Sequence, residues 1–307
     1  MTWVVIGDGP WGRALARRLA RGGSTPLLVG ARRIGARVPK GVEHTTDLAA
    51  ALAGTERVVL AVPVGRLEPL LAEAAPRLRG DHRVLTAVRG LTPKTHLRPA
   101  EAVATLTAVR QIAVLAGAAD PDALRQKTPA AMVVGSAFPS WSAEVQQALV
   151  APSLRIYTNT DPIGVELASL MASVLGVALG IARAMAVGPA TEATALTRAL
   201  AEMDRVVRAM GGRANTAYGL AGLGVITELA FDGGREQFRV GAALARGELE
   251  AAREAVELRA AARALAARAA RQRIAAPMVT AIDALFDGHL RADEALRGLM
   301  SRTAGAE

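Results

Sequence analysis

Cysteine is absent from the 307-residue sequence. Its absence excludes disulfide bonds, thiolate metal ligands and a cysteine nucleophile. Aromatic residues are also scarce, at 3% of the chain, although 51% of the residues are hydrophobic. The core must therefore consist mainly of Ala, Val and Leu, and a chain with this composition is expected to fold rather than to stay disordered.

Several other signals are missing. No spacing of Asp, Glu and His suggests a metal site, so no metal is expected. The opening residues Met1-Thr2-Trp3-Val4-Val5-Ile6-Gly7 enter a strand at once and leave no room for a signal peptide, which predicts a cytoplasmic protein. The uncharged run from Leu167 to Ala182 is shorter than the roughly 20 residues that span a bilayer, so it predicts a buried core helix and no membrane span.

The formal net charge is +9. Positive charge of this size can mark a nucleic-acid partner. Here it is spread along the chain, without interleaved aromatic residues and without a known nucleic-acid motif, so no nucleic-acid partner is expected. Small anionic ligands remain compatible with this charge.

The first half of the sequence alternates short apolar runs with helical segments. The runs are continuous, which is typical of strands covered on both faces. Strands that alternate with helices indicate βαβ units and a mostly parallel sheet, hence an α/β domain. The predicted strands are Trp3–Gly7, Pro26–Ala31, Arg57–Val62, Arg83–Val88, Ile112–Gly117, Ala130–Gly135 and Leu154–Thr158.

From Asp161 onward the pattern is helical, with no clear strand run. Thr160-Asp161-Pro162 supplies a helix start, and the segment Gly219–Gly224 is predicted to be a glycine-rich loop. The sequence therefore predicts an α/β domain over residues 1–160 and an all-α domain over residues 161–307. Three long helices are predicted. The first follows Pro162 and ends at about Val187, the second runs from about Ala190 to Met210, and the third runs from Glu248 to Gln272.

A glycine-rich motif follows the first predicted strand. Gly7-Asp8-Gly9-Pro10-Trp11-Gly12 has the pattern G-x-G-x-x-G and opens a helix, the setting of a Rossmann dinucleotide-binding turn. Gly7 allows the tight turn, Gly9 lets the backbone approach a pyrophosphate, and Gly12 lets the helix pack on the strand. The helix N-terminus offers N–H groups to the phosphates. Asp8 is unusual there, because a carboxylate disfavours a nearby pyrophosphate unless it points away.

About twenty residues further on, an NAD-preferring site would carry Asp or Glu for the ribose hydroxyls. This chain has Gly30-Ala31-Arg32-Arg33 there. An arginine pair suits the additional phosphate of NADP, so NADP(H) is expected in preference to NAD(H). The alternative is that Arg32, Arg33 or both are simply solvated.

The same motif, continued by Arg13-Ala14-Leu15-Ala16, resembles the opening signature of the bacterial NAD(P)-dependent glycerol-3-phosphate dehydrogenases. The resemblance extends along nearly the whole chain, through Ala61-Val62-Pro63, Ala113-Val114-Leu115 with Gly117, Tyr157-Thr158-Asn159, Ile163-Gly164-Val165-Glu166-Leu167, Leu196-Thr197-Arg198 and Gly219–Gly224. It implies an N-terminal Rossmann domain, an all-helical substrate and dimerisation domain, an active site in the cleft between them, and a homodimer.

Members of this family reduce dihydroxyacetone phosphate with NAD(P)H. Hydride attack on the ketone requires a cationic group at the developing alkoxide, and the substrate phosphate requires a cationic cradle. On this resemblance the cofactor-binding residues are Gly7, Gly9, Pro10, Trp11, Gly12, Arg32, Arg33, Pro63, Arg89 and Glu257.

The sequence departs from the family where the reaction takes place. The family's Glu-Leu-x-x-x-x-Lys-Asn places its catalytic Lys at Ala172, followed by Ser173, and the Asp that pairs with that Lys falls on Val225. Arg89 replaces the Lys of a Lys-Gly pair. It keeps the positive charge and could act electrostatically, but its pKa is too high for proton transfer.

The phosphate-binding side changes as well. The family's Ser-Gly-Pro is Ala116-Gly117-Ala118, and its Arg-Asn falls on Glu236-Gln237. A glutamate facing a phosphate would repel it, although a shift of one residue would place Arg235 there instead. The expected substrate cleft consists of Gly117, Ala172, Ser173, Val225, Glu236 and Gln237.

Three functions therefore compete. The first is a catalytically degenerate relative, a pseudoenzyme that still binds a dinucleotide. The second is an NADP-dependent oxidoreductase acting on another carbonyl or hydroxy substrate, with Arg89 as an electrostatic group. The third is glycerol-3-phosphate dehydrogenase activity with a replaced active site. Glu236 is the residue that weighs most against the third.

Overall fold

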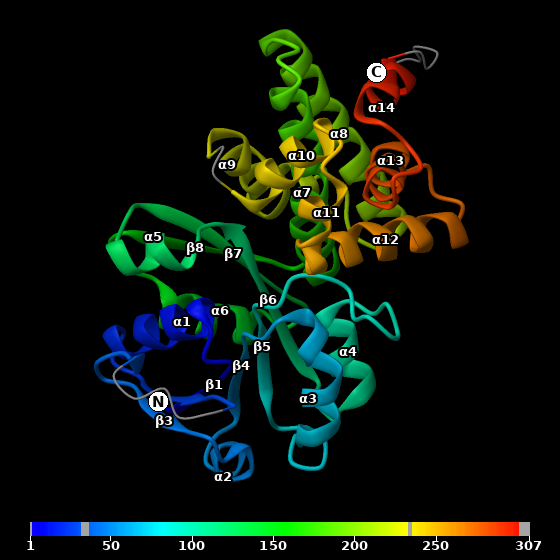
Figure 1. Ribbon diagram of the computed structural model, residues 1–307. Coiled ribbons are helices and arrows are strands. Elements are labelled where there is room, and N and C mark those ends of the chain that lie inside the picture. The colour runs from blue at the N-terminus through cyan, green and yellow to red at the C-terminus, as the bar shows by residue number, and fades with distance from the viewer. Residues whose placement is uncertain (1, 32–36, 233–234, 301–307) are drawn as a thin grey trace. The chain divides into compact units, whose positions relative to one another are not determined.

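The structure is a computed structural model that describes residues 2–31, 37–232 and 235–300 (Figure 1). The chain divides into two compact units, Met1–Leu167 and Ala168–Glu307. The division falls within helix α7 (Pro162–Ala184). The domain boundary predicted at residue 160 stays a prediction.

The first unit is built on an eight-stranded sheet with the order β3-β2-β1-β4-β5-β6-β7-β8. Neighbouring strands are parallel except β6 and β7, which are antiparallel. The predicted α/β fold with a mostly parallel sheet is therefore confirmed. The strands are β1 (Thr2–Ile6), β2 (Thr25–Val29), β3 (Glu43–Thr45), β4 (Arg57–Leu60), β5 (Arg83–Thr86), β6 (Gln111–Ala118), β7 (Ala130–Ser136) and β8 (Leu154–Asn159).

Strand β3 was not among the predicted strands. It is short and polar, with the sequence Glu-His-Thr, and it lies at the edge of the sheet beside Leu27–Val29 of β2. A three-residue edge strand with no buried residue carries no apolar signal. It nevertheless positions His44 next to the end of β2, which matters for the site described below.

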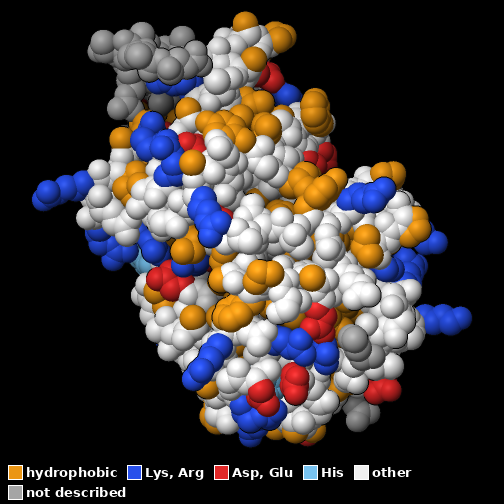
Figure 2. Space-filling view, turned by 180° about the vertical axis from the view of Figure 1, so that it is seen from behind, with side chains coloured by type: hydrophobic (Ala, Val, Ile, Leu, Met, Phe, Trp, Pro, Cys, Tyr) orange, Lys and Arg blue, Asp and Glu red, His pale blue; other side chains and the backbone are white. Residues whose placement is uncertain are grey.

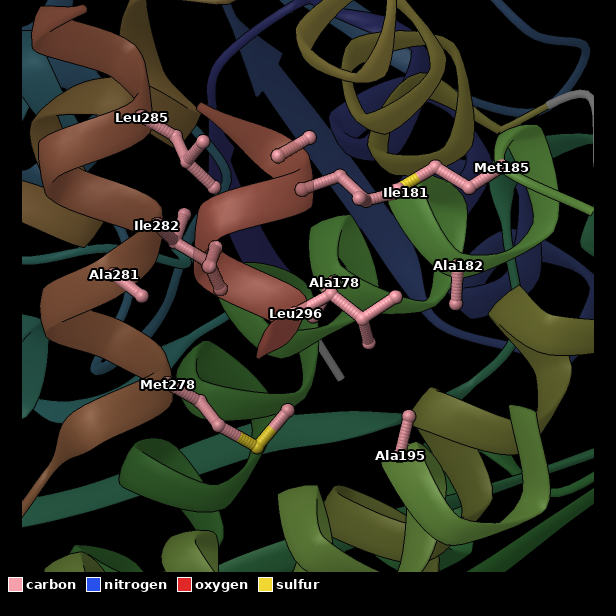
Figure 3. Close-up of a pocket in the computed structure, with 12 residues that line it drawn as sticks. Ala178, Ile181, Ala182, Met185, Ala195, Met278, Ala281, Ile282, Leu285 and Leu296 are labelled. Carbon is pink, nitrogen blue, oxygen red and sulfur yellow. The ribbon is translucent and has the colours of Figure 1, made fainter. Parts of the chain in front are cut away.

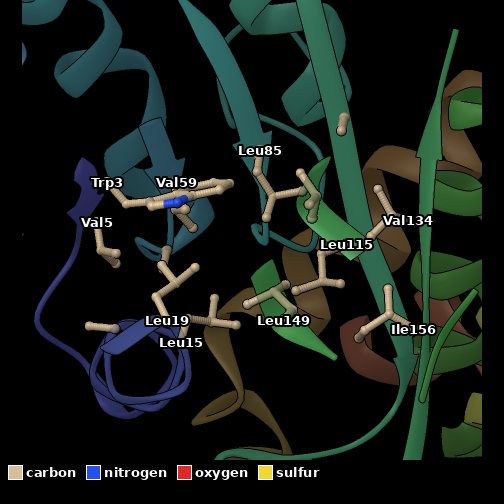
Figure 4. Close-up of a cluster of buried hydrophobic side chains, with 14 of the residues drawn as sticks. Trp3, Val5, Leu15, Leu19, Val59, Leu85, Leu115, Val134, Leu149 and Ile156 are labelled. Atoms are coloured by element: carbon tan, nitrogen blue, oxygen red, sulfur yellow. The ribbon is translucent and has the colours of Figure 1, made fainter. Parts of the chain in front are cut away.

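Helices cover both faces of the sheet (Figure 1). Successive residues of β1 point to opposite faces: Trp3 and Val5 belong to one buried cluster, Val4 and Ile6 to the other. Figure 4 shows the first cluster, in which Leu15 and Leu19 of α1 pack beneath β1. Helices α1 (Pro10–Arg21), α5 (Pro121–Gln126) and α6 (Pro139–Leu149) border that cluster, and α2 (Leu48–Ala53), α3 (Leu67–Ala74) and α4 (Pro99–Leu106) border the other.

The described part of the second unit contains helices and no strand, as predicted. The predicted helix Glu248–Gln272 is wrong as a single element, because it is divided at Glu254 and Ala255. Ala255 is a strong helix former, yet it is buried with ψ at 64°, so packing overrides its propensity. The helices after α7 are α8 (Pro189–Ala209), α9 (Val225–Phe231), α10 (Glu236–Ala245), α11 (Leu249–Arg253), α12 (Val256–Arg271), α13 (Pro277–Asp287) and α14 (Ala292–Met300).

The glycine-rich segment before α9 is also not the predicted open loop. Leu220–Gly224 forms a π-helical turn that leads directly into α9. A Cβ at Gly222 would lie 2.0 Å from the carbonyl oxygen of Ala217, so only glycine allows this close backbone approach. Single π-helical turns of this kind are frequent at functional sites.

Helix α7 is apolar and long enough to span a membrane, but its most apolar window is 94% buried inside the protein, as in a core helix. It packs closely on α10. A Cβ at Gly180 would lie 2.8 Å from the Cα of Phe238, and a Cβ at Gly241 would lie 2.5 Å from the carbonyl oxygen of Val177. The two helices therefore meet backbone to backbone at these glycines.

Candidate functional site

The turn between β1 and α1 has the geometry of a phosphate-binding turn. Gly7 adopts φ +117°, and a Cβ on it would lie 2.2 Å from the carbonyl oxygen of Ala61. A Cβ on Gly12 would lie 1.7 Å from the carbonyl oxygen of Gly7, whereas a Cβ on Gly9 would meet nothing within 4 Å. Close backbone contacts therefore exclude a side chain at Gly7 and at Gly12. At Gly9 the space next to the backbone is open.

Helix α1 begins at this turn with Gly9 as its N-cap, Pro10 in the first turn and no side-chain cap. The N–H groups of Trp11 and Gly12 lie in the first turn, where backbone donors have no partner within the helix. The first turn carries no acidic residue. Its N–H groups and the positive end of the helix dipole are suited to binding an anionic group such as a phosphate.

Three further predicted residues follow neighbouring strands of the same sheet. Pro63 comes after β4, Arg89 comes after β5, and Gly117 lies near the end of β6. These strands are successive and parallel, so their carboxyl ends share one edge with the β1–α1 turn. Pro63 and Arg89 are exposed, whereas Gly117 is buried against Met132 of β7. Ligands of open parallel sheets bind at this edge.

Arg32 and Arg33 lie outside the described residues, so their predicted contact with an additional phosphate stays a prediction. The residue that does lie at the end of β2 is Asp8. A Cβ built on Gly30 would be 2.3 Å from Oδ2 of Asp8 and 2.9 Å from Nε2 of His44. The Asp8 carboxylate therefore reaches over the end of β2, a position that the sequence pattern could not show.

A buried ion pair, also missed from the sequence, fixes the segment that follows Arg89. Nη1 of Arg98 donates to Glu166 over 2.8 Å, and the backbone N–H of Ala100 donates to the same carboxylate over 2.9 Å. Arg98 is the N-cap residue of α4. Burial raises the pKa of Glu166, while Arg98 and the Ala100 N–H favour its charged form. The pair ties the start of α4 to the first turns of α7.

In the second unit, the positions predicted for acid–base chemistry are apolar and buried. Ala172 is 0% exposed and Val225, the first residue of α9, is 2% exposed. Beside Ala172 on α7, Ser173 accepts a 3.0 Å hydrogen bond from the amide of Gln237 on α10. Neither Ala172 nor Val225 can donate a proton.

The two remaining predicted residues of this unit are carboxylates. Glu236 is exposed in the first turn of α10, and Glu257 is exposed in the first turn of α12. Partial desolvation raises the pKa of Glu257, and the charge of Glu236 raises it further. Arg235, the alternative phosphate ligand, forms ion pairs with Glu228 and Asp232.

The second unit contains an apolar cavity of about 50 Å³, lined by residues that include Ile181, Met185, Met278 and Leu285 (Figure 3). Ligand pockets usually exceed about 300 Å³ and carry several polar groups. Lys and Arg side chains are dispersed over the face drawn in Figure 2 rather than gathered in one patch. Within the described residues, no group of three or more His, Asp or Glu side chains could hold a metal ion.

Comparisons with known proteins match nearly the whole chain. The family model described as NAD-dependent glycerol-3-phosphate dehydrogenase N-terminus matches residues 31–142, and the model described as its C-terminus matches residues 161–297. The glycerol-3-phosphate dehydrogenase (NAD(P)+) of Deinococcus radiodurans is 36% identical over 99% of this chain and 96% of its own length. The enzyme of the same name from Cereibacter sphaeroides is 32% identical over 97% of each chain.

A solved structure has the same fold over the full length. The crystal structure of glycerol-3-phosphate dehydrogenase from Coxiella burnetii superimposes with a TM-score of 0.88 at 27% sequence identity. The match covers 98% of this chain and 99% of that chain.

Proposed function

The chain belongs to the NAD-dependent glycerol-3-phosphate dehydrogenase family, and from this premise we propose that it binds a nicotinamide dinucleotide without interconverting dihydroxyacetone phosphate and glycerol 3-phosphate. The observation that carries the proposal is the burial of Ala172 and Val225 at the positions where the family resemblance expects a catalytic Lys and its Asp partner. On this proposal, the chain has kept the family's cofactor site and has lost the family's acid–base pair.

The β1–α1 turn fits a dinucleotide. Gly9 leaves the backbone open, and the uncapped first turn of α1 directs the N–H groups of Trp11 and Gly12 toward an anion. When bound, the cofactor supplies or accepts a hydride. The chain's own contribution is to bind the pyrophosphate and to present Pro63 and Arg89 at the same edge of the sheet. The contact of Glu257 with the nicotinamide ribose stays a prediction.

The proposed loss of chemistry follows from what the side chains can do. Reduction of a ketone needs a group that gives a proton to the forming alkoxide or stabilises it. Alanine at position 172 can do neither, and Arg89, which holds its proton too tightly to transfer it, could contribute only its charge. Val225 removes the carboxylate that would otherwise be buried without a partner, which is costly. The proposed loss therefore affects the catalytic Lys position, Ala172, and its Asp partner position, Val225, together.

The substrate side supports the same proposal. Glu236 brings a negative charge where a phosphate would need a positive one, and Glu257 adds a second carboxylate nearby. Arg235, which could compensate, is paired with Glu228 and Asp232. A phosphorylated triose is a poor ligand for such a surface. If the protein has an activity, the carboxylates favour a neutral or cationic carbonyl substrate.

A single titration series tests the proposal. The purified full-length protein is titrated with NADPH and NADH by calorimetry, and dihydroxyacetone phosphate is then added at high concentration while NAD(P)H absorbance is followed. The Deinococcus radiodurans relative serves as the active control under the same conditions. Cofactor binding without oxidation supports the proposal. Steady oxidation at a rate near that of the relative contradicts it.

Three finer properties belong to the same proposal. The arginine pair at positions 32 and 33 favours NADP(H) over NAD(H). The family resemblance implies a homodimer, which light scattering would test against the monomer mass of 31.8 kDa. It also implies a cytoplasmic location, which fractionation of source cells would test.

A further inference from the structure

The Asp8 carboxylate occupies the space that a side chain on Gly30 would fill. Asp8 is the second residue of the glycine-rich turn, yet its Oδ2 lies only 2.3 Å from the point where a side chain on Gly30 would begin. Gly30 directly follows β2 (Thr25–Val29). In dinucleotide-binding folds, the residue that binds the adenosine ribose is an Asp or Glu near this point. Here that position is a glycine, and a carboxylate from the neighbouring turn fills the space.

The described part of the chain does not engage the Asp8 carboxylate elsewhere. The backbone oxygen of Asp8 accepts a 2.7 Å hydrogen bond from Arg13, but within the described residues no hydrogen bond or ion pair engages its carboxylate. Asp8 is partly exposed, so a ligand can reach it. Its carboxylate is directed toward the end of β2, which explains how a carboxylate is tolerated within a phosphate-binding turn.

A second polar atom lies at the same point. Nε2 of His44 would be 2.9 Å from a Cβ on Gly30, and among the described residues this buried nitrogen has no hydrogen-bond partner. Buried polar atoms almost always have a partner in a native structure, so a nitrogen that the described residues leave unpaired beside a carboxylate indicates a ligand group that pairs with it. Vicinal hydroxyls can donate to Asp8 and can either donate to or accept from His44, depending on the ring tautomer.

We propose that the Asp8 carboxylate binds the adenosine ribose hydroxyls of the dinucleotide and discriminates against a 2′-phosphate. This inference rests on the proposed dinucleotide binding. Hydrogen bonds from hydroxyls to a carboxylate are charge-assisted and strong, whereas a 2′-phosphate would face the same negative charge at close range. Asp8 therefore opposes the NADP(H) preference expected from Arg32 and Arg33. It gives NAD(H) an affinity that the arginine pair alone would not provide.

Calorimetric titration of the full-length protein with NADH, NADPH and adenosine 2′,5′-bisphosphate tests this assignment. Asp8→Asn keeps the shape of the side chain and removes the charge. We expect it to weaken NADH binding by about tenfold and to strengthen binding of both 2′-phosphorylated ligands by about threefold or more. Glu43→Gln is the matched control, because it removes one negative charge from the exposed residue next to His44 on β3. It should change the ratio of NADPH to NADH affinity less than twofold.

Moving the carboxylate provides a second, independent measurement. Asp8→Ala combined with Gly30→Asp restores a carboxylate at the end of β2 from the usual position. The φ angle of Gly30 is outside the left-handed region, and once the Asp8 carboxylate is removed, the new Cβ displaces only the ring end of His44, 2.9 Å away. We expect this double variant to recover most of the NADH affinity that Asp8→Ala loses. If Asp8→Asn changes NADH and NADPH affinity by the same factor, the inference is wrong while dinucleotide binding stands. If the wild-type protein binds no dinucleotide, both proposals are wrong.

Discussion

The side-chain amide of Gln237 donates a 3.0 Å hydrogen bond to the hydroxyl of Ser173, and both side chains are more than nine-tenths buried. The bond joins α10 to α7 one residue beyond Ala172. The close approach of the two helices at Gly180 and Gly241 keeps the bonding partners together. The amide of Gln237 and the hydroxyl of Ser173 thus satisfy each other inside the protein, as expected if the proposed loss of the catalytic Lys left the fold intact.

The first prediction concerns this hydrogen bond. Gln237→Ala removes the donor and leaves the Ser173 hydroxyl buried beside a small cavity, so we expect a loss of about 1–3 kcal/mol in the free energy of unfolding. Urea denaturation measures the change. Gln272→Ala, at an exposed site after α12, is the control and should cost less than about 0.5 kcal/mol. A loss no larger than the control's would mean that the bond contributes nothing to stability.

The second prediction concerns Ala172 and Val225, the positions of the acid–base pair whose loss we propose. Ala172→Lys places a charge in a fully buried site, so we expect it to destabilise the protein by about 3 kcal/mol or more. Ala172→Met has a similar length without the charge and separates overpacking from desolvation. Adding Val225→Asp to Ala172→Lys should recover at least about 1 kcal/mol if the two positions face each other as the family resemblance implies.

The same double variant also tests the assignment of the substrate side. It should still not oxidise NADPH with dihydroxyacetone phosphate, because Glu236 and Glu257 remain. Robust turnover by Ala172→Lys with Val225→Asp would show that these carboxylates do not exclude the substrate. The assignment of Glu236 to the phosphate position would then be wrong.

The fold could be predicted from the sequence because its signals are local. Continuous apolar strands, a glycine-rich turn after β1 and the change to helical periodicity near Asp161 are each contained in short segments. The strand β3 escaped prediction because Glu43-His44-Thr45 carries no apolar pattern. The break at Ala255 escaped it because packing decides the backbone there, against a strong helical propensity.

At the candidate site, sequence spacing points most directly to positions where the backbone itself would contact the ligand. Gly7, Gly9 and Gly12 have roles that follow from lacking a side chain, and spacing alone identifies them. The direction of the Asp8 side chain depends on Gly30 and His44, which come from other strands, so no local pattern shows it. The Arg98–Glu166 pair joins residues 68 positions apart, and a sequence without aligned relatives gives no sign of such a contact.

The third prediction concerns pH. Partial desolvation and the charge of Glu236 hold the pKa of Glu257 above its usual value of 4.5. The folded carboxyl therefore keeps its proton more tightly than the unfolded one. Its contribution to stability is fully present below pH 4.5 and is lost as the pH rises through the folded pKa.

Removing the charge of Glu236 should reduce the dependence of stability on pH above 4.5. We expect Glu236→Gln to lower the pKa of Glu257 and to flatten the fall in stability above pH 4.5. Carboxyl NMR titration of Glu257 measures the first effect, and urea denaturation across the acidic range measures the second. Glu254→Gln, an exposed charge just before α12, is the control. An unchanged Glu257 titration in Glu236→Gln would show that the two carboxylates do not interact.

The last prediction concerns the arginine pair after β2. Arg32→Ala with Arg33→Ala should weaken NADPH binding by about tenfold or more and NADH binding by less than about threefold, because only NADPH offers a 2′-phosphate to a guanidinium. Calorimetry at two salt concentrations measures both affinities. The salt dependence of NADPH binding should fall in the variant, since ion pairs with an exposed phosphate are screened. Arg37→Ala, an exposed arginine shortly after the pair, controls for the loss of positive charge in this region. Equal effects on the two cofactors would refute the role of Arg32 and Arg33 without touching that of Asp8, whose removal is expected to change the same affinity ratio in the opposite direction.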